Sequence, residues 1–267
     1  MTVAQASADR YSDPTFVGAY LEAEWGDKLQ ECSLLAKSHL DELCAPCISG
    51  FYREVAQFAQ ELVGETQIDK ICDIGCSTGR FLYEFSRLFP PMKDVLGVEP
   101  SPIFTDYARK FLLKEKRDEL KWIPLPNSPT NPTYIELNGE FFESIEIEEQ
   151  KRAALNIFTG MGESTPRPEN HFDLLFCLNV IDRHPTPKAF IEKLGRLLGK
   201  GGFFFLASPM DWDKRFTEPE HWVDDLAQLF NERGWEKKRA TDLLYPFRYT
   251  IRHKTIYASQ VVCMTRI

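Results

Sequence analysis

The stretch Lys70-Ile-Cys-Asp-Ile-Gly-Cys-Ser-Thr-Gly-Arg80 indicates the fold of this chain. An apolar run over 71–74 ends at the glycines Gly75 and Gly79, and an amphipathic run over 80–88 follows them. This order predicts a strand, a glycine turn and a helix. Glycines allow the backbone to approach a ligand closely, and the first turn of a helix offers free N–H groups.

An acidic residue after the next strand indicates a nucleoside ligand. The apolar run over 94–98 ends in Glu99, and an acid about 20 residues after the glycine turn can accept both hydroxyls of a ribose. Asp73 stands where a dinucleotide site would hold pyrophosphate, which its charge would repel. It suits instead a cationic ligand, such as the amino group or sulfonium of S-adenosylmethionine. The alternative is an ordinary strand–turn–helix unit without a ligand.

Composition excludes several classes of function. The chain has 267 residues, a net charge of -8 and a pI near 5.3. This length fits one large domain or a core with a small addition, and the acidic balance argues against a dedicated nucleic-acid or anionic-membrane surface. The polar segment 1–13 does not resemble a signal segment, and no apolar run approaches the roughly 20 residues of a membrane span. We expect a cytoplasmic protein without nucleic-acid or membrane partners.

Seven cysteines are scattered along the chain, and Cys44 and Cys47 form the only Cys-x-x-Cys pair. This pair could be a redox dithiol or half of a zinc site. It has no second pair nearby and does not follow a predicted strand, which favours buried or idle thiols. We therefore expect no bound metal.

Residues 1–62 are predicted to form a helical cap, with two or three helices between Tyr11 and Leu62. Apolar residues recur at helical spacing at Phe16, Ala19, Tyr20 and Ala23, and again at Phe51, Val55, Phe58 and Leu62. The cap either packs on the edge of the sheet or closes over the cofactor as a lid, with Tyr11, Tyr20 or Arg53 reaching inward. These two roles are compatible.

An insertion is expected over 115–154. The segment 122–133 holds four prolines and predicts an extended loop. The runs 134–137 and 140–142 flank Asn138-Gly139, a pair that suits a turn with positive φ at both central residues. We predict a β-hairpin here, which either covers the substrate pocket or decorates the surface.

The remaining chain, 63–267, alternates apolar runs with helical patterns. After the first two strands, further strands are predicted over 155–158, 171–178, 203–207, 235–240 and 259–265, and helices over 103–114, 188–198 and 222–233. Alternation of this kind gives a parallel sheet with helices on both faces. The long connection 241–258 lacks a helical pattern and suits an antiparallel final pair. We predict a doubly wound α/β fold with a seven-stranded, mostly parallel sheet.

This pattern resembles the class I S-adenosylmethionine-dependent methyltransferases. The resemblance is carried by the glycine turn with Asp73, by Glu99, and by the fourth-strand segment before Lys200-Gly-Gly202. It implies a Rossmann-like methyltransferase fold over 63–267, S-adenosylmethionine as cofactor, S-adenosylhomocysteine as product, and no metal. The cofactor-binding residues that it implies are Tyr11, Arg53, Asp73, Gly75, Cys76, Gly79, Glu99, Pro100, Gly160, Met161 and Asn179.

One position departs from the pattern of these enzymes. Many relatives carry Gly-Asp after the third strand, where the aspartate binds the adenine amino group. Here Gly160 is followed by Met161. We therefore expect the adenine to be held by backbone and apolar contacts, or by Glu163.

A closer resemblance appears at Cys177-Leu-Asn-Val-Ile-Asp-Arg183. This stretch is similar to the Asn-Leu-Ile-Asp-Arg signature of the 4-mercaptohistidine N-methyltransferase domain of ovothiol biosynthesis, and protein-histidine N-methyltransferases carry a similar stretch. His184 and Pro185 depart from what usually follows it. Flanking pieces that resemble the ovothiol domain are Tyr11–Gly26, the Asn138-Gly139 region, Ser208-Pro209, Trp212, Thr217–Trp222 and Pro246–Lys254. The resemblance implies a small-molecule substrate methylated on a histidine imidazole.

An imidazole acceptor must present a lone pair on one ring nitrogen and carry its proton on the other. A carboxylate on that N–H fixes the tautomer and stabilises the developing positive charge. Asp182 is the catalytic candidate, and Asn179 could orient the ring or the methionine part of the donor. The alternatives are a helix cap for Asp182 and a loop hydrogen bond for Asn179. The substrate-binding candidates are Arg183, Trp212, Tyr245, Arg248 and Arg252.

Each substrate-binding candidate also has a structural reading. Arg183 could form a salt bridge with Asp182 or Glu192, and the other basic residues could belong to a solvated stretch. Three further functions stay open: methylation of a histidine within a protein, O- or carboxyl-methylation of another metabolite, and a cofactor-binding module without catalysis.

Overall fold

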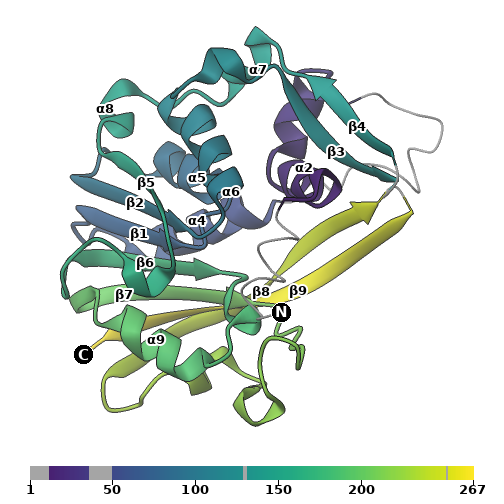
Figure 1. Cartoon of the computed structure of the whole chain (residues 1–267). Helices are drawn as coiled ribbons and strands as arrows, with labels where there is room; N and C mark the ends of the chain where they lie inside the picture. Colours follow the sequence, from purple (N-terminus) through teal and green to yellow (C-terminus); the bar gives the residue numbers. More distant parts are fainter. Residues whose placement is uncertain (1–11, 36–49, 129–130, 251) are drawn as a thin grey trace.

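A seven-stranded sheet forms the centre of the computed structural model, which describes residues 12–35, 50–128, 131–250 and 252–267 (Figure 1). In their order across the sheet, the strands are β5 (Leu155–Thr159), β2 (Asp94–Glu99), β1 (Lys70–Ile74), β6 (Phe172–Leu178), β7 (Leu198–Ser208), β9 (His253–Arg266) and β8 (Trp235–Thr250). The first five run parallel, whereas β9 is antiparallel to β7 and to β8. The predicted doubly wound, mostly parallel sheet is confirmed.

Helices cover both faces of this sheet, because a strand such as β6 is apolar on both sides. Leu174 of β6 packs in one apolar cluster with α4 (Phe51–Val63) and α5 (Arg80–Leu88). The next residue, Leu175, packs in the other cluster with α9 (Pro187–Gly195). The shorter elements are α6 (Pro102–Ala108), α7 (Gly139–Ser144), α8 (Glu149–Arg152), the π-helical turn η1 (Arg109–Leu113), and the 3-10 turns η2 (Arg117–Glu119), η3 (Gly162–Ser164), η4 (Ile181–Arg183), η5 (Pro219–His221) and η6 (Leu226–Leu229).

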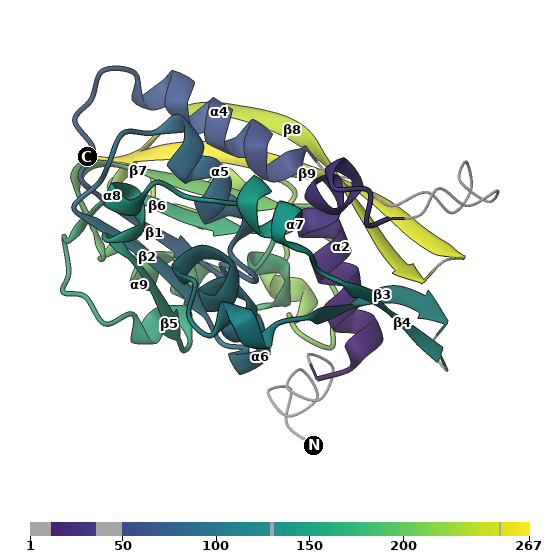
Figure 2. The same cartoon turned by 90° about the horizontal axis from the view of Figure 1, so that it is seen from above.

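The helix α2 (Pro14–Glu31) lies between two hairpins that project on the same side of the molecule (Figure 2). Asp13 begins it, since its Oδ1 accepts a hydrogen bond from Thr15 N at 2.8 Å. Gly18 touches the first hairpin so closely that a Cβ atom would lie 2.7 Å from the backbone carbon of Leu125. The helix is therefore buried on several sides, and it is part of the folded core.

The predicted hairpin turn at Asn138-Gly139 is wrong. The first hairpin consists instead of β3 (Trp122–Ser128) and β4 (Asn131–Glu136), so the proline-rich segment is strand rather than loop. Prolines are tolerated there because each strand of a two-stranded sheet has an unpaired edge. Asn138 Oδ1 accepts a hydrogen bond from Phe141 N at 2.9 Å and caps α7. A helix N-cap is the other preferred use of asparagine.

In the C-terminal part, the predicted antiparallel final pair is confirmed, but its strands are longer than expected and one predicted helix is wrong. β8 and β9 pair as far as Thr250 and His253, so most of the connection 241–258 is strand, and the two strands extend beyond the central sheet (Figure 1). The helix expected over 222–233 is replaced by irregular chain with the turn η6. Asp225 caps this turn, and Gln260 of β9 accepts from Leu226 N at 2.7 Å, which holds the backbone out of a helix.

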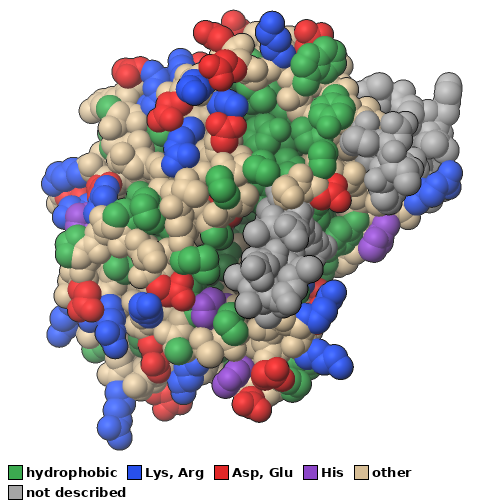
Figure 3. All heavy atoms as spheres, viewed as in Figure 1, with side chains coloured by type: hydrophobic (Ala, Val, Ile, Leu, Met, Phe, Trp, Pro, Cys, Tyr) green, Lys and Arg blue, Asp and Glu red, His purple; other side chains and the backbone are tan. Residues whose placement is uncertain are grey.

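On the face shown in Figure 3, acidic and basic side chains are interspersed and form no large patch of a single charge. None of the helices in the described ranges combines the length and the apolar character needed to cross a bilayer.

The described cysteines, Cys32, Cys72, Cys76, Cys177 and Cys263, are buried and form no disulfide. The pair Cys44 and Cys47 lies outside the described residues. Within the described ranges, no cluster of His, Cys, Asp and Glu is arranged to hold a metal ion.

Candidate active site

The glycine turn lies tightly between the ends of β2 and β6. Gly75 and Gly79 have φ values of 78° and 90°, which favour glycine. The N–H groups of Gly75 and Cys76 donate to Val98 O at 2.7 and 3.1 Å. A Cβ atom on Gly75 would lie 2.3 Å from Val180 Cγ2, so a larger residue would push these chain ends apart. The turn is thereby fixed against the edge where the parallel strands end.

Glu99 ends β2 directly beside this turn and is 6% exposed. Its carboxylate accepts hydrogen bonds from Ser77 N at 3.2 Å and from Ser101 N at 2.9 Å. Burial raises the pKa of Glu99 to about 7, although these two hydrogen bonds oppose the shift. Each carboxylate oxygen keeps a second lone pair, so Glu99 retains the capacity to accept ribose hydroxyls.

A further carboxyl group comes from α2. Glu24 is 2% exposed, and its Oε2 accepts hydrogen bonds from the N–H of Thr78, at 3.2 Å, and from its hydroxyl. Trp25 Nε1 donates to the same Thr78 hydroxyl at 2.8 Å. Burial raises the pKa of Glu24 to about 7, against the opposing effects of the neighbouring Ser77, Thr78 and Arg80. Burial also raises the pKa of Asp73, and the charges of Glu24 and Glu99 add to this effect.

The loop after β6 carries the two catalytic candidates. Asn179 has a φ of 57°, its N–H donates to Ala207 O at 2.8 Å, and its Oδ1 accepts from Ser259 Oγ at 2.9 Å. Asp182 lies in η4 and is 2% exposed. Burial raises the pKa of Asp182 to about 6, while the charge of Arg183 opposes the shift. Asp182 is therefore mostly ionised at neutral pH.

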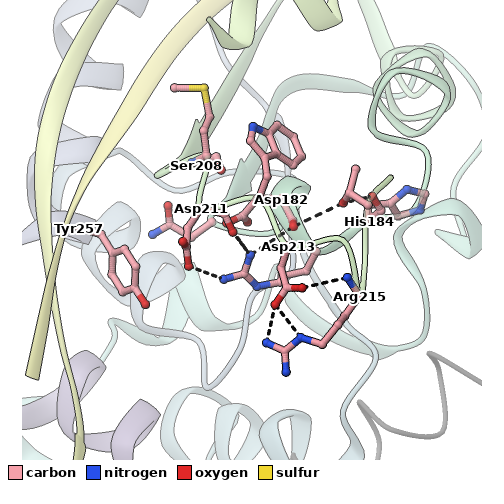
Figure 4. Close-up of polar contacts among 12 residues, drawn as sticks. Asp182, His184, Ser208, Asp211, Asp213, Arg215 and Tyr257 are labelled. Atoms are coloured by element: carbon pink, nitrogen blue, oxygen red, sulfur yellow. Dashed lines mark hydrogen bonds and ion pairs between the residues drawn. The ribbon is translucent and has the colours of Figure 1, made fainter. Parts of the chain in front are cut away.

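A pocket of about 510 Å³ opens beside this loop (Figure 4). Two ion pairs line it: Arg183 Nη2 lies 2.9 Å from Asp211 Oδ2, and Arg215 Nε lies 2.7 Å from Asp213 Oδ2. Arg183 Nη1 also lies 3.1 Å from Asp182 Oδ2, which connects the pocket to the catalytic candidate. The remaining lining residues are Phe216, Tyr249, His253, Thr255 and Tyr257. The pocket thus offers both signs of charge together with aromatic surface.

Comparison with known proteins identifies this arrangement. Residues 18–238 match the sequence model of a family described as a methyltransferase domain. The chain belongs to this methyltransferase family. A sequence search of curated proteins finds no match.

Solved structures agree with the methyltransferase fold. The magnesium protoporphyrin IX methyltransferase of Synechocystis, solved with bound S-adenosylmethionine, is 16% identical, with a TM-score of 0.52 over 96% of this chain and 98% of that one. A protein from a study of thioacetal formation in echinomycin biosynthesis is also 16% identical, with a TM-score of 0.50 over 79% of this chain and 81% of that one. These likenesses show the fold, and the family match makes the protein a methyltransferase; the methyl donor expected from its sequence is S-adenosylmethionine.

Four buried polar atoms at this edge fit the methionine part of such a cofactor. Glu24 Oε1, Asp73 Oδ1, Ser77 Oγ and Asn179 Nδ2 have no hydrogen-bond partner among the described residues. Buried polar groups normally have one. An α-ammonium group needs acceptors and an α-carboxylate needs donors, and these atoms offer both.

The other expected cofactor residues are spread around this edge. Gly160 N donates to Glu99 O at 3.0 Å, and Met161 is 52% exposed. Pro100 and Arg53 are also exposed, and Tyr11 lies outside the described residues. Tyr20, which was expected to reach inward from the cap, packs against Phe104 and Phe247. Glu163, an alternative partner for adenine, lies 3.3 Å from His184 Nε2.

Of the expected substrate-binding residues, Arg183 lines the pocket and the other four do not. Trp212 Nε1 donates to Val223 O at 2.9 Å, and Tyr245 is buried against Tyr52. Arg248 forms a buried ion pair with Glu22 of α2. Arg252 is exposed.

Sequence reasoning missed Glu24, Arg215, Tyr249 and Tyr257. The stretch Leu21-Glu-Ala-Glu-Trp25 carried a signal for Glu24, because two acids within an apolar helical pattern indicate buried carboxyl groups. No comparable signal marked the pocket residues, because the pocket joins Arg215, from the chain after β7, to Tyr249 and Tyr257, from the paired strands β8 and β9.

Proposed function

We propose that this methyltransferase transfers the methyl group of S-adenosylmethionine to a ring nitrogen of histidine or of a small histidine derivative such as mercaptohistidine. One observation carries the proposal: the buried carboxyl group of Asp182 adjoins a pocket that presents two arginines and two aspartates. An imidazole ring requires the carboxylate, and an amino-acid zwitterion matches the paired charges.

Asp182 would act on the acceptor ring. Its carboxylate would accept the N–H of the distal ring nitrogen and leave the other nitrogen with a free lone pair. It would also stabilise the positive charge that develops on the ring during transfer. The cofactor supplies an activated methyl group, so the remaining tasks of the protein are alignment of the lone pair and exclusion of water.

The charged pairs would bind the amino-acid part of the substrate. Arg183 or Arg215 would exchange a bond to its aspartate for a bond to the substrate carboxylate, and Asp211 or Asp213 would receive the ammonium group. A volume of about 510 Å³ supports a small molecule. We further propose that 1–62 acts as a cap on the catalytic domain 63–267. The insertion 115–154 would hold α2 of this cap, since β3 packs on that helix.

A panel of acceptors with methyl-labelled cofactor tests the proposal. Histidine and mercaptohistidine should be labelled on a ring nitrogen. Histamine, which lacks the carboxylate, and imidazolepropionate, which lacks the ammonium, should react more slowly. Preference for a histidine-containing peptide would indicate a protein substrate, and a base-labile methyl ester would indicate carboxyl methylation. Tight cofactor binding without transfer to any acceptor would indicate a binding module.

A further inference from the structure

We propose that Glu24 of α2 binds the α-ammonium group of S-adenosylmethionine together with Asp73, so that the N-terminal cap contributes a charged residue to the cofactor site. This inference concerns the methyl donor and is independent of the acceptor proposed above.

The backbone and the side chain of Glu24 are both fixed against the glycine turn. Thr78 donates to Glu24 Oε2 through its N–H and its hydroxyl. Arg80, at the start of α5, donates from Nη1 to the Glu24 carbonyl oxygen at 2.5 Å and binds Asp27 of α2 at 2.5 and 2.7 Å. The carboxyl group is therefore held at the edge where β1, with Asp73 next to its last residue, and β2, with Glu99 as its last residue, end.

The buried oxygens that lack a hydrogen-bond donor indicate which part of the cofactor Glu24 binds. Glu24 Oε1 and Asp73 Oδ1 are buried acceptors without donors among the described residues. An ammonium group brings three N–H donors, whereas a sulfonium brings none. The ammonium group is therefore the part of the cofactor that satisfies both oxygens.

The surroundings compensate the charge of Glu24 only in part. The cation that faces it, Arg80, is shared between Asp27 and Glu84. The other titratable groups whose charges are coupled to that of Glu24 are Asp73, Glu99, Cys76, Tyr52 and Tyr245. Burial raises the pKa values of all three acids, and the charges of neighbouring acids add to the shifts of Asp73 and Glu99, so part of the cluster is protonated near neutral pH. A bound cation favours the ionised forms and must release protons.

Proton release in the wild-type protein is the first test. Calorimetric titration with S-adenosylmethionine at pH 6.5, in buffers of different ionisation enthalpy, should show release of on the order of one proton per cofactor. At this pH the ligand amino group, with a pKa of about 7.7–8.0 for such amines, stays protonated and contributes little. Absence of proton release would overturn the proposal.

The variant Glu24→Gln is the second test, because it keeps the shape and an acceptor for Thr78 but removes the charge. Its Kd should rise about tenfold or more for S-adenosylmethionine and equally for S-adenosylhomocysteine, which has the ammonium but no sulfonium. Proton release should decrease. Binding of 5′-methylthioadenosine, which lacks the amino acid, should not change. Glu31→Gln, an exposed position on the same helix, is the matched control.

Two outcomes contradict the assignment. Unchanged Kd and unchanged proton release would mean that Glu24 only anchors α2. Weaker binding of S-adenosylmethionine with unchanged binding of S-adenosylhomocysteine would assign Glu24 to the sulfonium instead. If Glu24→Gln does not fold, Glu24→Asp keeps the charge one methylene shorter, and it should retain proton release with weaker binding of both ligands. Unchanged affinity of Glu24→Asp for both ligands would overturn the proposal.

Discussion

The cofactor edge and the acceptor pocket handle charge in opposite ways. At the cofactor edge, burial raises the pKa values of Glu24, Asp73 and Glu99, and the charges of neighbouring acids add to the shifts of Asp73 and Glu99. In the pocket, Arg183 and Arg215 are each paired with an aspartate in a space that is open to solvent. When the ligand binds, the acids of the cofactor edge gain a cation that they lack in the free protein. In the pocket, by contrast, the arginines and aspartates exchange bonds to one another for bonds to the ligand.

This difference predicts different responses to mutation. A buried, unpaired acid contributes strongly to ligand binding because no water replaces the lost partner. An exposed ion pair contributes little, since water and salt screen both charges. Asp182 stands between these cases, because it is buried but touches Arg183.

The largest effect is expected for Asp182→Asn, which keeps the shape and removes the charge. Electrostatic stabilisation of a developing charge contributes about 2–4 kcal/mol, so kcat should fall at least roughly thirtyfold. Cofactor affinity should change little. Wild-type rates with histidine derivatives would refute the imidazole-orienting role and leave Asp182 as a structural residue of η4.

The pH dependence of activity should also differ between the wild type and Asp182→Asn. Asp182 must be ionised to accept the ring N–H. The activity of the enzyme is therefore present above the Asp182 pKa of about 6 and is lost as the pH falls through that value. The imidazole acceptor must be neutral and titrates near 6.5. Plots of log(kcat/KM) against pH should therefore reach a slope of two at low pH in the wild type, and a slope of one in Asp182→Asn. Equal slopes would exclude ionisation of Asp182 from the mechanism.

A smaller effect is expected for Glu99→Gln. Loss of a charged acceptor for the ribose hydroxyls should raise the Kd for S-adenosylmethionine by roughly tenfold, with kcat little changed. Calorimetry with 5′-methylthioadenosine separates this site from that of Glu24, because this ligand has the ribose but no amino acid. Glu99→Gln should weaken its binding. Unchanged affinity for both ligands would refute the ribose assignment.

The smallest effect is expected for Arg215→Met in the acceptor pocket. The side chain is 75% exposed, and exposed ion pairs contribute about 0.2–1 kcal/mol, so the acceptor KM should rise by no more than about fivefold. Cofactor affinity should be unchanged. Arg196→Met serves as the control, because Arg196 is similarly exposed and pairs with Glu169 away from the pocket. Equal effects in both variants would show that the pocket charges do not select the substrate.

The sequence predicted the backbone around the glycine turn better than the arrangement of the pocket. Gly75, Gly79 and Glu99 belong to one local strand–turn–helix–strand unit, whose backbone conformation leaves a pattern in the residues themselves. The pocket depends on register: pairing of β8 with β9 brings Tyr249 and Tyr257 together, with their hydroxyl oxygens 2.6 Å apart. No local signal encodes that register.

The errors arose where one motif permits two structures. Asn138-Gly139 suits a hairpin turn as well as a helix start, and the capping hydrogen bond to Phe141 decides between them. The segment 241–258 lacks helical periodicity, which is compatible with loop and with strand. Its pairing with β9 and its contact with α2 decide for strand, and these are tertiary contacts that the sequence alone does not reveal.

The ion pair between Glu22 and Arg248 also affects the order in which parts of the chain can fold during synthesis on the ribosome. Its two members are 226 positions apart. At about 5–20 residues per second, α2 is made roughly 10–45 s before its cation partner exists. A carboxylate is costly to bury alone, so we expect α2 to complete its docking only after β8 has been synthesised. If Glu24 of α2 binds the methyl donor as proposed, that part of the cofactor site is completed at the same late stage.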